Sequence, residues 1–215
     1  MKVAKLYSVN DIRIEEMPVP KIGPKEALIR MKACGICTGD IVQWYIERKA
    51  PLVFGHEPAG VVEKVGEEVN NFQVGDRVFV HHHVPCMVCE ACRKGRYVHC
   101  KTWRNTRLDP GGMAEFVRVP EINLRYDTLK LPETLSFHDG ALIEPTATAI
   151  KSLKRARIQP GERMAVIGLG VMGQLHIILG RQFGVSDIFG LDMVPYRLKK
   201  AIEFGATAVI DICLL

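Results

Sequence analysis

The chain has 215 residues, of which 47% are hydrophobic and 25% are charged, so it can bury one sizeable core or two modest ones. Its formal net charge of +5 is spread along the sequence, which argues only weakly for an acidic partner. The N-terminus reaches charged residues before an apolar targeting segment can form, and the most apolar later run, residues 165–180, is interrupted by glycines, Gln174 and His176. We therefore expect a cytoplasmic protein with no membrane partner.

The first part of the chain has the pattern of an all-β domain. Short strand-like apolar runs are separated by Gly, Pro and Asp at the intervals expected of a β-barrel or sandwich. Examples of these runs lie at residues 26–33, 60–66, 76–82 and 115–119.

Beyond residue 150 the pattern changes to alternating strands and helices. We predict strands at 162–170, 187–192 and 206–211, with helices at 171–184 and 195–205 between them. Such alternation is typical of parallel βαβ units. We place the first domain at residues 1–152 and the second at 153–215, with the joint in the basic helix end and Pro-Gly turn of residues 152–162.

Four cysteines in one short segment, Cys86, Cys89, Cys92 and Cys100, form the most informative motif of the chain. Thiolates at every third position followed by a fourth let one loop enclose a tetrahedral metal, and zinc is the metal expected of such ligands. Charged and glycine residues between the cysteines argue against their burial as ordinary core. We predict a structural zinc site.

Two other interpretations of this cysteine segment are weaker. Disulfides are disfavoured because no secretory context is visible, and reducing compartments keep such clusters as thiolates on metal. A zinc finger that reads nucleic acid would use a helix that the segment lacks, although basic residues lie close by: Arg93, Lys94, Arg96, Lys101, Arg104 and Arg107. We therefore expect no nucleic-acid partner.

A glycine motif follows the first predicted strand of the second domain. Its glycines allow a tight turn and close approach to a pyrophosphate, which the free N–H groups of the following helix can bind. Asp192 closes the next strand, where a carboxylate can bind the adenosine ribose and repel a 2′-phosphate, so NAD is favoured over NADP. A glycine turn that merely packs a helix on a sheet is the alternative. The expected cofactor contacts are Gly168, Gly170, Val171, Met172, Gly173, Asp192 and Arg197.

A third set of candidate ligands is scattered along the first domain. It comprises Cys34 and Cys37 with the nearby Asp40, then His56 and Glu57, and finally Glu144. A thiolate, an imidazole and a carboxylate on turns of a β domain could converge on a zinc that keeps an open position. Spacing alone does not establish that they do, and polar residues satisfied in barrel loops are the alternative.

Together these motifs resemble the zinc-dependent medium-chain alcohol and polyol dehydrogenases, including sorbitol and threonine dehydrogenases. The resemblance rests on the cysteine segment, on CGIC followed by GHE, on GDRV at 75–78, on IEP at 143–145 and on GLGVMG at 168–173. It covers essentially all of the chain. It implies a GroES-like β-barrel catalytic domain with two zincs, a following Rossmann domain, and hydride transfer between a secondary alcohol or polyol and NAD.

The resemblance also implies roles for single residues. It makes Cys37 and His56 ligands of the catalytic zinc and leaves Cys34 as packing. Glu144 matches a ligand position that polyol dehydrogenases fill with Glu, and Glu57 matches a carboxylate that can enter or leave the coordination shell. Which of the two is the resting third ligand stays open. Asp40 matches a residue that orients the histidine.

One departure from the family pattern puts the proton route in doubt. The family usually has Ser or Thr two residues after the ligand cysteine and often a His three residues later, where this chain has Gly39 and Val42. Thr38, or water bridged through Glu57 or a histidine of the run 81–83, could serve instead. A strand would alternate the faces of that run, so at most two of its histidines should face the cleft. Trp44 and Tyr45 are candidates for the substrate wall or the core.

The sequence stops after the third predicted strand of the second domain, whereas a doubly wound dinucleotide fold needs about six. We expect the 215-residue chain to be an N-terminal portion that is inactive alone, and the full-length protein to be a homo-oligomer, dimer or tetramer. The alternative function is a truncated, zinc-stabilised module without catalysis. The sequence favours a polyol over a simple primary alcohol only weakly, through Glu144.

Overall fold

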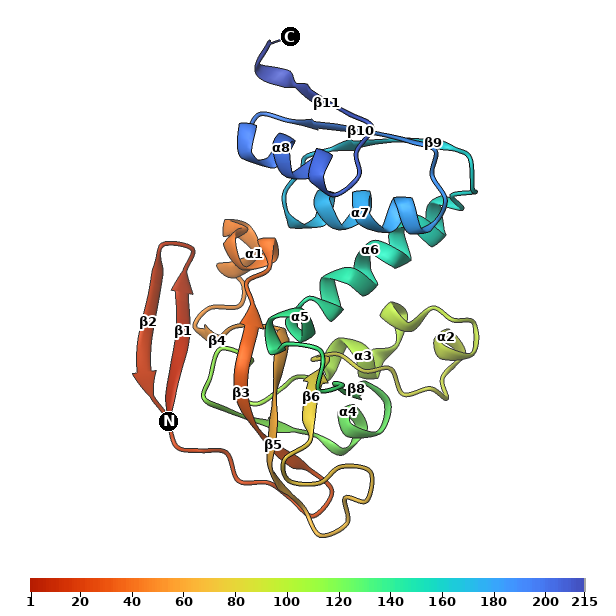
Figure 1. Ribbon diagram of the computed structural model, residues 1–215. Coiled ribbons are helices and arrows are strands. Elements are labelled where there is room, and N and C mark those ends of the chain that lie inside the picture. The colour runs from red at the N-terminus through yellow and green to blue at the C-terminus, as the bar shows by residue number, and fades with distance from the viewer. Residues whose placement is uncertain (215) are drawn as a thin grey trace. The chain divides into compact units, whose positions relative to one another are not determined.

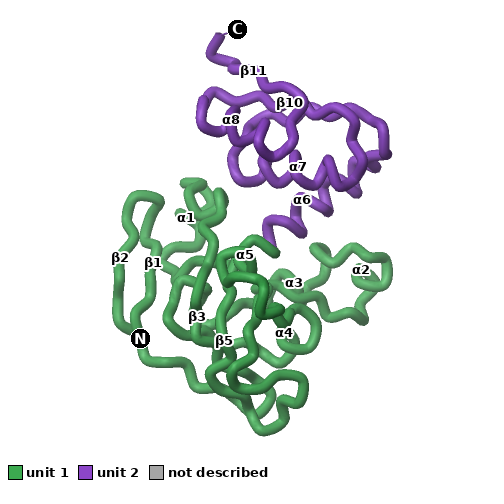
Figure 2. Tube along the Cα trace, viewed as in Figure 1, with its two compact units in different colours: residues 1–143 green, residues 144–215 purple. Residues whose placement is uncertain are grey.

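The computed structural model describes residues 1–214, which form two compact units, residues 1–143 and 144–214 (Figure 2). The first unit is mainly antiparallel β-structure and the second alternates strands with helices (Figure 1). This agrees with the predicted fold class, a GroES-like β domain followed by part of a Rossmann domain. No helix within residues 1–214 is both long and apolar enough to cross a membrane.

The first unit is organised around a five-stranded antiparallel sheet in the order β7-β3-β5-β6-β8. Its strands are β3 (Ala27–Gly35), β5 (Glu57–Val65), β6 (Arg77–Val80), β7 (Phe116–Val119) and β8 (Thr128–Lys130). A second sheet, in the order β2-β1-β4, contains β1 (Lys2–Ser8), β2 (Asp11–Glu16) and β4 (Leu52–Val53). The alternating apolar residues of these strands form the core, which includes Ile29, Val62, Val78, Val117 and Val119.

The helices of the first unit are short and lie in the connections between strands. After β3 come η1 (Thr38–Ile41) and α1 (Gln43–Ile46), and after β6 come α2 (Glu90–Arg93), η2 (Tyr97–His99) and α3 (Lys101–Asn105). The remaining two are α4 (Glu121–Tyr126) and α5 (Phe137–Ala141). The cysteine segment therefore has helical turns, but each is only three to five residues long.

The second unit contains a parallel three-stranded sheet in the order β11-β10-β9. Helix α6 (Ile143–Ala156) begins at the unit boundary, and β9 (Arg163–Ile167), α7 (Val171–Gln182), β10 (Asp187–Asp192), α8 (Pro195–Glu203), β11 (Ala208–Asp211) and η3 (Ile212–Leu214) follow. Helices α7 and α8 lie on the same face of the sheet (Figure 1). The core on that face includes Leu169, Ile177, Ile188, Leu198 and Ala201.

The strand register explains where the functional loops lie. Gly35 pairs with Glu57 across β3 and β5, so the end of one strand and the start of the other meet. In the second unit Leu191 pairs with Ile167, which places the glycine turn after β9 beside the carboxyl end of β10. Residues far apart in the sequence are thus brought together at strand ends.

Candidate metal and dinucleotide sites

The four sulfur atoms of Cys86, Cys89, Cys92 and Cys100 lie within 4.8 Å of one another. The Sγ atoms of Cys86 and Cys92 are 3.9 Å apart, and those of Cys89 and Cys92 are 3.5 Å apart. Four sulfurs around zinc, with Zn–S bonds of about 2.3 Å, are separated by about 3.8 Å at the corners of a tetrahedron. The spacing of the thiols therefore fits zinc.

Backbone N–H groups of the cysteine segment point at its sulfur atoms. The N–H of Cys89 donates to Cys86 Sγ at 3.3 Å, and the N–H of Cys86 donates to Cys100 Sγ at 3.4 Å. Although burial opposes the effect, the N–H donors of Cys86 and Trp103 lower the pKa of Cys100 to about 6. Because the thiolate is the form that binds metal, these donors prepare the loop for a cation.

A second cluster is formed by Cys37, His56 and Glu57, each of which offers a ligand atom within 4.8 Å of the others. Cys37 caps η1 directly after β3, and Glu57 is the first residue of β5. A Cβ on Gly35 would lie 1.8 Å from Glu57 Oε2, so this glycine makes room for the carboxylate. Within residues 1–214 the cluster has three ligands of mixed type and no fourth, which is the donor set of a catalytic zinc rather than of a closed structural site.

Asp40 lies behind this second cluster. Its carboxylate is buried, accepts the N–H of Cys37 at 3.1 Å, and lies 3.8 Å from His56 Nδ1. Burial raises the pKa of Asp40, although His56 and the N–H of Cys37 act in the opposite direction. Asp40 faces the Nδ1 side of the ring at ion-pair distance, longer than a hydrogen bond.

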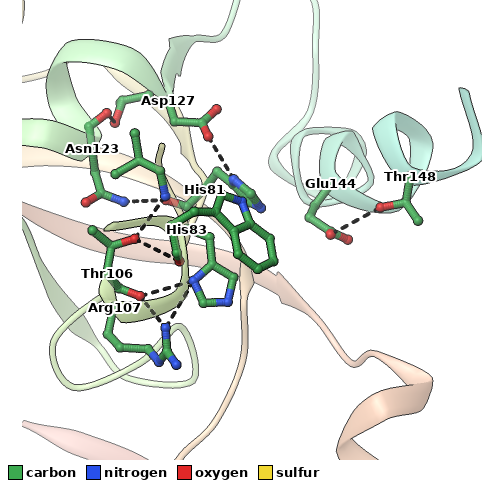
Figure 3. Close-up of polar contacts among 11 residues, drawn as sticks. His81, His83, Thr106, Arg107, Asn123, Asp127, Glu144 and Thr148 are labelled. Atoms are coloured by element: carbon green, nitrogen blue, oxygen red, sulfur yellow. Dashed lines mark hydrogen bonds and ion pairs between the residues drawn. The ribbon is translucent and has the colours of Figure 1, made fainter. Parts of the chain in front are cut away.

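Cys34, Thr38 and Glu144 are the remaining candidates, and none of them is a member of the three-residue cluster. Burial raises the pKa of Cys34 to about 12, and a Cβ on Gly112 would lie 2.7 Å from its sulfur, which is the environment of a packed neutral thiol. Thr38 is exposed. Glu144 belongs to the second unit, where its Oε1 accepts a hydrogen bond from the Thr148 hydroxyl at 3.3 Å (Figure 3).

The histidine run follows the end of β6 and does not form part of the strand. The expected alternation of its faces is wrong, because β6 ends at Val80 and the three rings then lie against one another: His82 is 3.8 Å from His83 and 4.9 Å from His81 between ring centroids. His82 also contacts His56, at 4.9 Å. Burial lowers the pKa of His82, so its ring is neutral. Sequence reasoning missed this contact, because nothing in the run distinguishes its middle histidine.

Hydrogen bonds fix the outer two histidines. His81 Nδ1 is 2.8 Å from Asp127 Oδ2, and His83 Nδ1 is 3.1 Å from the carbonyl oxygen of Thr106 (Figure 3). Trp44 and Tyr45, which could have been core residues, are instead 62% and 37% exposed. They are available to line a binding surface.

The glycine turn of the second unit has the conformation that its sequence predicts. Gly168 has a φ of +87°, which favours glycine, and a Cβ on Gly173 would lie 2.0 Å from the carbonyl oxygen of Gly168. Nothing lies within 4 Å of the position of a Cβ on Gly170, so a ligand can approach the backbone there. Val171 and Met172 begin helix α7, whose first N–H groups are free to bind a phosphate.

Asp192 joins the end of β10 to this glycine turn. Its Oδ2 accepts the N–H of Leu169 at 2.6 Å, and its Oδ1 accepts the N–H groups of Met193 and Val194. Arg197 Nη1 is 3.6 Å from Oδ2. Although burial opposes the effect, these N–H donors, led by that of Leu169, lower the pKa of Asp192. Asp192 is therefore an ionised carboxylate beside the turn, with only 6% of its side chain exposed.

Comparison with known proteins gives consistent matches. Residues 23–133 match the family described as "Alcohol dehydrogenase GroES-like domain". The chain is 37% identical to sorbitol dehydrogenase of Bacillus subtilis (strain 168) over 220 residues, which is 99% of this chain but 61% of that protein. It therefore spans about three fifths of the length of this relative.

Solved structures show the same similarity. That of 2R,3R-butanediol dehydrogenase from Bacillus subtilis is 32% identical with a TM-score of 0.83, and the match covers 100% of this chain and 64% of that one. That of a short chain alcohol dehydrogenase from Escherichia coli CFT073, in complex with NADH, is 29% identical with a TM-score of 0.85 and covers 98% and 62%. The chain belongs to the zinc-dependent medium-chain alcohol and polyol dehydrogenase family.

Proposed function

We propose that this chain is the zinc-binding part, with the first portion of the nucleotide-binding part, of an NAD-dependent dehydrogenase that acts on a secondary alcohol or polyol. The observation that carries the proposal is the convergence of Cys37, His56 and Glu57 from two strand ends. Zinc held there would stabilise the alkoxide form of the substrate, and NAD would accept the hydride. The names of the sorbitol and butanediol dehydrogenases support the substrate class.

The residues of the first unit prepare this site in three ways. In the proposal Cys37 and Glu57 supply negative charge for a cation, and the buried Asp40 would orient the His56 ring, whose Nδ1 lies 3.8 Å from its carboxylate. The neutral ring of His82 covers one side of His56. In the proposal Glu144 is the further carboxylate ligand that the family resemblance implies, and Thr38 is exposed, so that its hydroxyl can pass the substrate proton to water.

In the second unit the proposed roles divide between the turn and the strand end. The turn at Gly168, Gly170 and Gly173 and the start of α7 would receive the pyrophosphate. Asp192, with Arg197 beside it, would bind the ribose and disfavour a 2′-phosphate, which supports NAD over NADP. In the same proposal the zinc-binding functional domain comprises residues 1–152 and the nucleotide-binding one residues 153–215. The complete protein is a homo-oligomer in the cytoplasm.

The proposal is tested by following NADH formation by the complete gene product across a panel of polyols, secondary alcohols and primary alcohols. We expect turnover with polyols or secondary alcohols, dependence on zinc, and little turnover by the 215-residue chain alone. If the zinc-replete complete product bound two zincs but transferred no hydride from any of these alcohols to NAD, the alternative of a zinc-stabilised non-catalytic module would replace the proposed dehydrogenase.

A further inference from the structure

Gln174 joins the glycine turn of the second unit to the start of helix α8. It lies in the first turn of α7, and its Nε2 donates to two carbonyl oxygens, that of Leu169 at 3.1 Å and that of Arg197 at 2.9 Å. Leu169 belongs to the glycine turn, and Arg197 lies in the first turn of α8. One amide group thus holds together two segments that are far apart in the sequence.

The orientation of this amide follows from its partners. A carboxamide has two N–H donors and one acceptor oxygen, and both partners of Gln174 are carbonyl oxygens, so its nitrogen must face them. Its Oε1 is buried and has no hydrogen-bond partner within residues 1–214. Because a buried acceptor without a partner costs free energy, the side chain keeps this position for the two bonds that its nitrogen makes.

Asp192 contacts the same two residues. Its Oδ2 accepts the N–H of Leu169 at 2.6 Å and lies 3.6 Å from Arg197 Nη1. Gln174 therefore closes a ring of polar contacts, because it binds the carbonyl oxygen of each residue that Asp192 contacts. All four residues belong to the second compact unit. The positions of the Asp192 carboxylate and the Arg197 guanidinium are thus coupled through Gln174.

The two charged groups of this ring favour different dinucleotides. The carboxylate of Asp192 suits ribose hydroxyls and repels a 2′-phosphate, whereas the guanidinium of Arg197 attracts that phosphate. Hydrogen bonds weaken steeply when their distance or angle changes, but the attraction between opposite charges falls only gradually with distance. A looser contact between the glycine turn and α8 should therefore harm NAD binding more than NADP binding.

We propose that Gln174 is a positioning residue for cofactor selectivity. It acts through Leu169 and Arg197, whose spacing sets where the Asp192 carboxylate stands relative to the ribose. This inference rests on the proposed function, because it needs NAD at the glycine turn and at Asp192. It adds a residue that neither the glycine motif nor the acidic strand end identifies.

The test compares NAD and NADP binding by the zinc-replete complete gene product, measured by isothermal titration at one ionic strength. Gln174→Met keeps the length of the side chain and removes both donors. We expect the affinity for NAD to fall about three- to tenfold and that for NADP to fall less, so that the preference for NAD narrows. A merely structural role would weaken both affinities by the same factor, and that result would overturn the proposal, as would an unchanged or wider preference.

Gln182→Met is the matched control, because it makes the same substitution at the exposed last residue of α7. It should bind both dinucleotides as wild type does, and the same narrowing in it would overturn the proposal. Thermal melting checks that both variants fold. If Gln174→Met does not fold, Gln174→Asn takes its place, since its shorter amide cannot span both carbonyl oxygens and should narrow the preference in the same way.

A second background shows whether Gln174 acts through the carboxylate of Asp192. In Asp192→Ala the further change Gln174→Met should alter the ratio of the two affinities less than it does in wild type, because the group that it positions is gone. An equal alteration in both backgrounds would overturn the proposal.

Failure of the proposed function would look different. If the complete gene product bound neither dinucleotide, the nucleotide-binding role of the second unit would be contradicted, and this inference with it. A preference for NAD that Gln174→Met leaves unchanged would contradict the positioning role alone.

Discussion

The two candidate zinc clusters of the first unit are assembled in opposite ways. All four ligands of the cysteine cluster come from one segment, 86–100, and its own backbone N–H groups point at the sulfurs. The cluster of Cys37, His56 and Glu57 exists only because Gly35 pairs with Glu57 across two strands. The first cluster can therefore organise its loop by binding metal, whereas the second depends on a sheet that is already folded.

The largest effect should come from breaking the cysteine cluster. Cys100→Ser replaces a buried ligand of the four-sulfur site, and structural zinc contributes directly to folding. We expect the loss of one zinc per chain and several kcal/mol of stability. Elemental analysis and thermal melting measure the two quantities.

Cys213→Ser is the matched control for that variant, because Cys213 is exposed and lies outside both clusters. It should keep two zincs and the wild-type melting temperature. A zinc-replete wild type that contained fewer than two zincs would contradict the assignment of two sites.

Loss of the second cluster should affect chemistry more than folding. Cys37→Ala removes a half-buried ligand from a cluster that the surrounding sheet holds in place. We expect zinc to fall from two per chain to one, hydride transfer by the complete gene product to be abolished, and stability to change by only about 1 kcal/mol. Zinc analysis, the rate of NADH formation and denaturant unfolding test this together.

Cys34→Ala provides the comparison for the second cluster. Cys34 packs against Gly55 and Gly112 and lies outside the cluster, so its removal should leave a small cavity and both zincs. Loss of a zinc in this variant would show that the ligand cysteine was assigned to the wrong position.

The contrast between local and long-range sites also explains what the sequence could predict. The cysteine spacing alone indicated a four-sulfur site, because every ligand lies in one segment. The apolar runs predicted β3, β5, β6 and β7 and the three strands of the second unit, but they did not identify β1, β2, β4 or β8. The second cluster needed a family resemblance, because the register that joins Gly35 to Glu57 cannot be obtained from spacing. The contact between His82 and His56 was not predicted, because it depends on where β6 ends.

The glycine turn of the second unit also depends on strand register, because β9 and β10 must pair to bring it beside Asp192. A variant of Asp192 tests the role of this strand end. Asp192→Ala leaves the buried N–H of Leu169 without its acceptor, which should cost about 1–3 kcal/mol, and removes the carboxylate expected at the ribose. We expect weaker NAD binding and a narrower preference for NAD over NADP in titrations of the complete gene product. Tighter NADP binding by the unmutated protein would contradict the role given to this strand end.

The smallest effect concerns His83, which belongs to the histidine run beside the second cluster. Burial and then Arg107 lower the pKa of His83 to about 4, from an ordinary value of 6.5. The folded protein therefore binds this proton less readily than the unfolded chain, and stability is lost as the pH falls from about 6.5 to about 4. His83→Asn should remove this part of the acid sensitivity, on the order of 1 kcal/mol for a half-buried group. Acid also releases zinc from wild type and from His83→Asn alike. The free energy of unfolding of each protein is therefore measured with denaturant from about pH 6.5 to about pH 4, and the slopes of that free energy against pH are compared. Parallel slopes would show that the proton affinity of His83 does not change on folding.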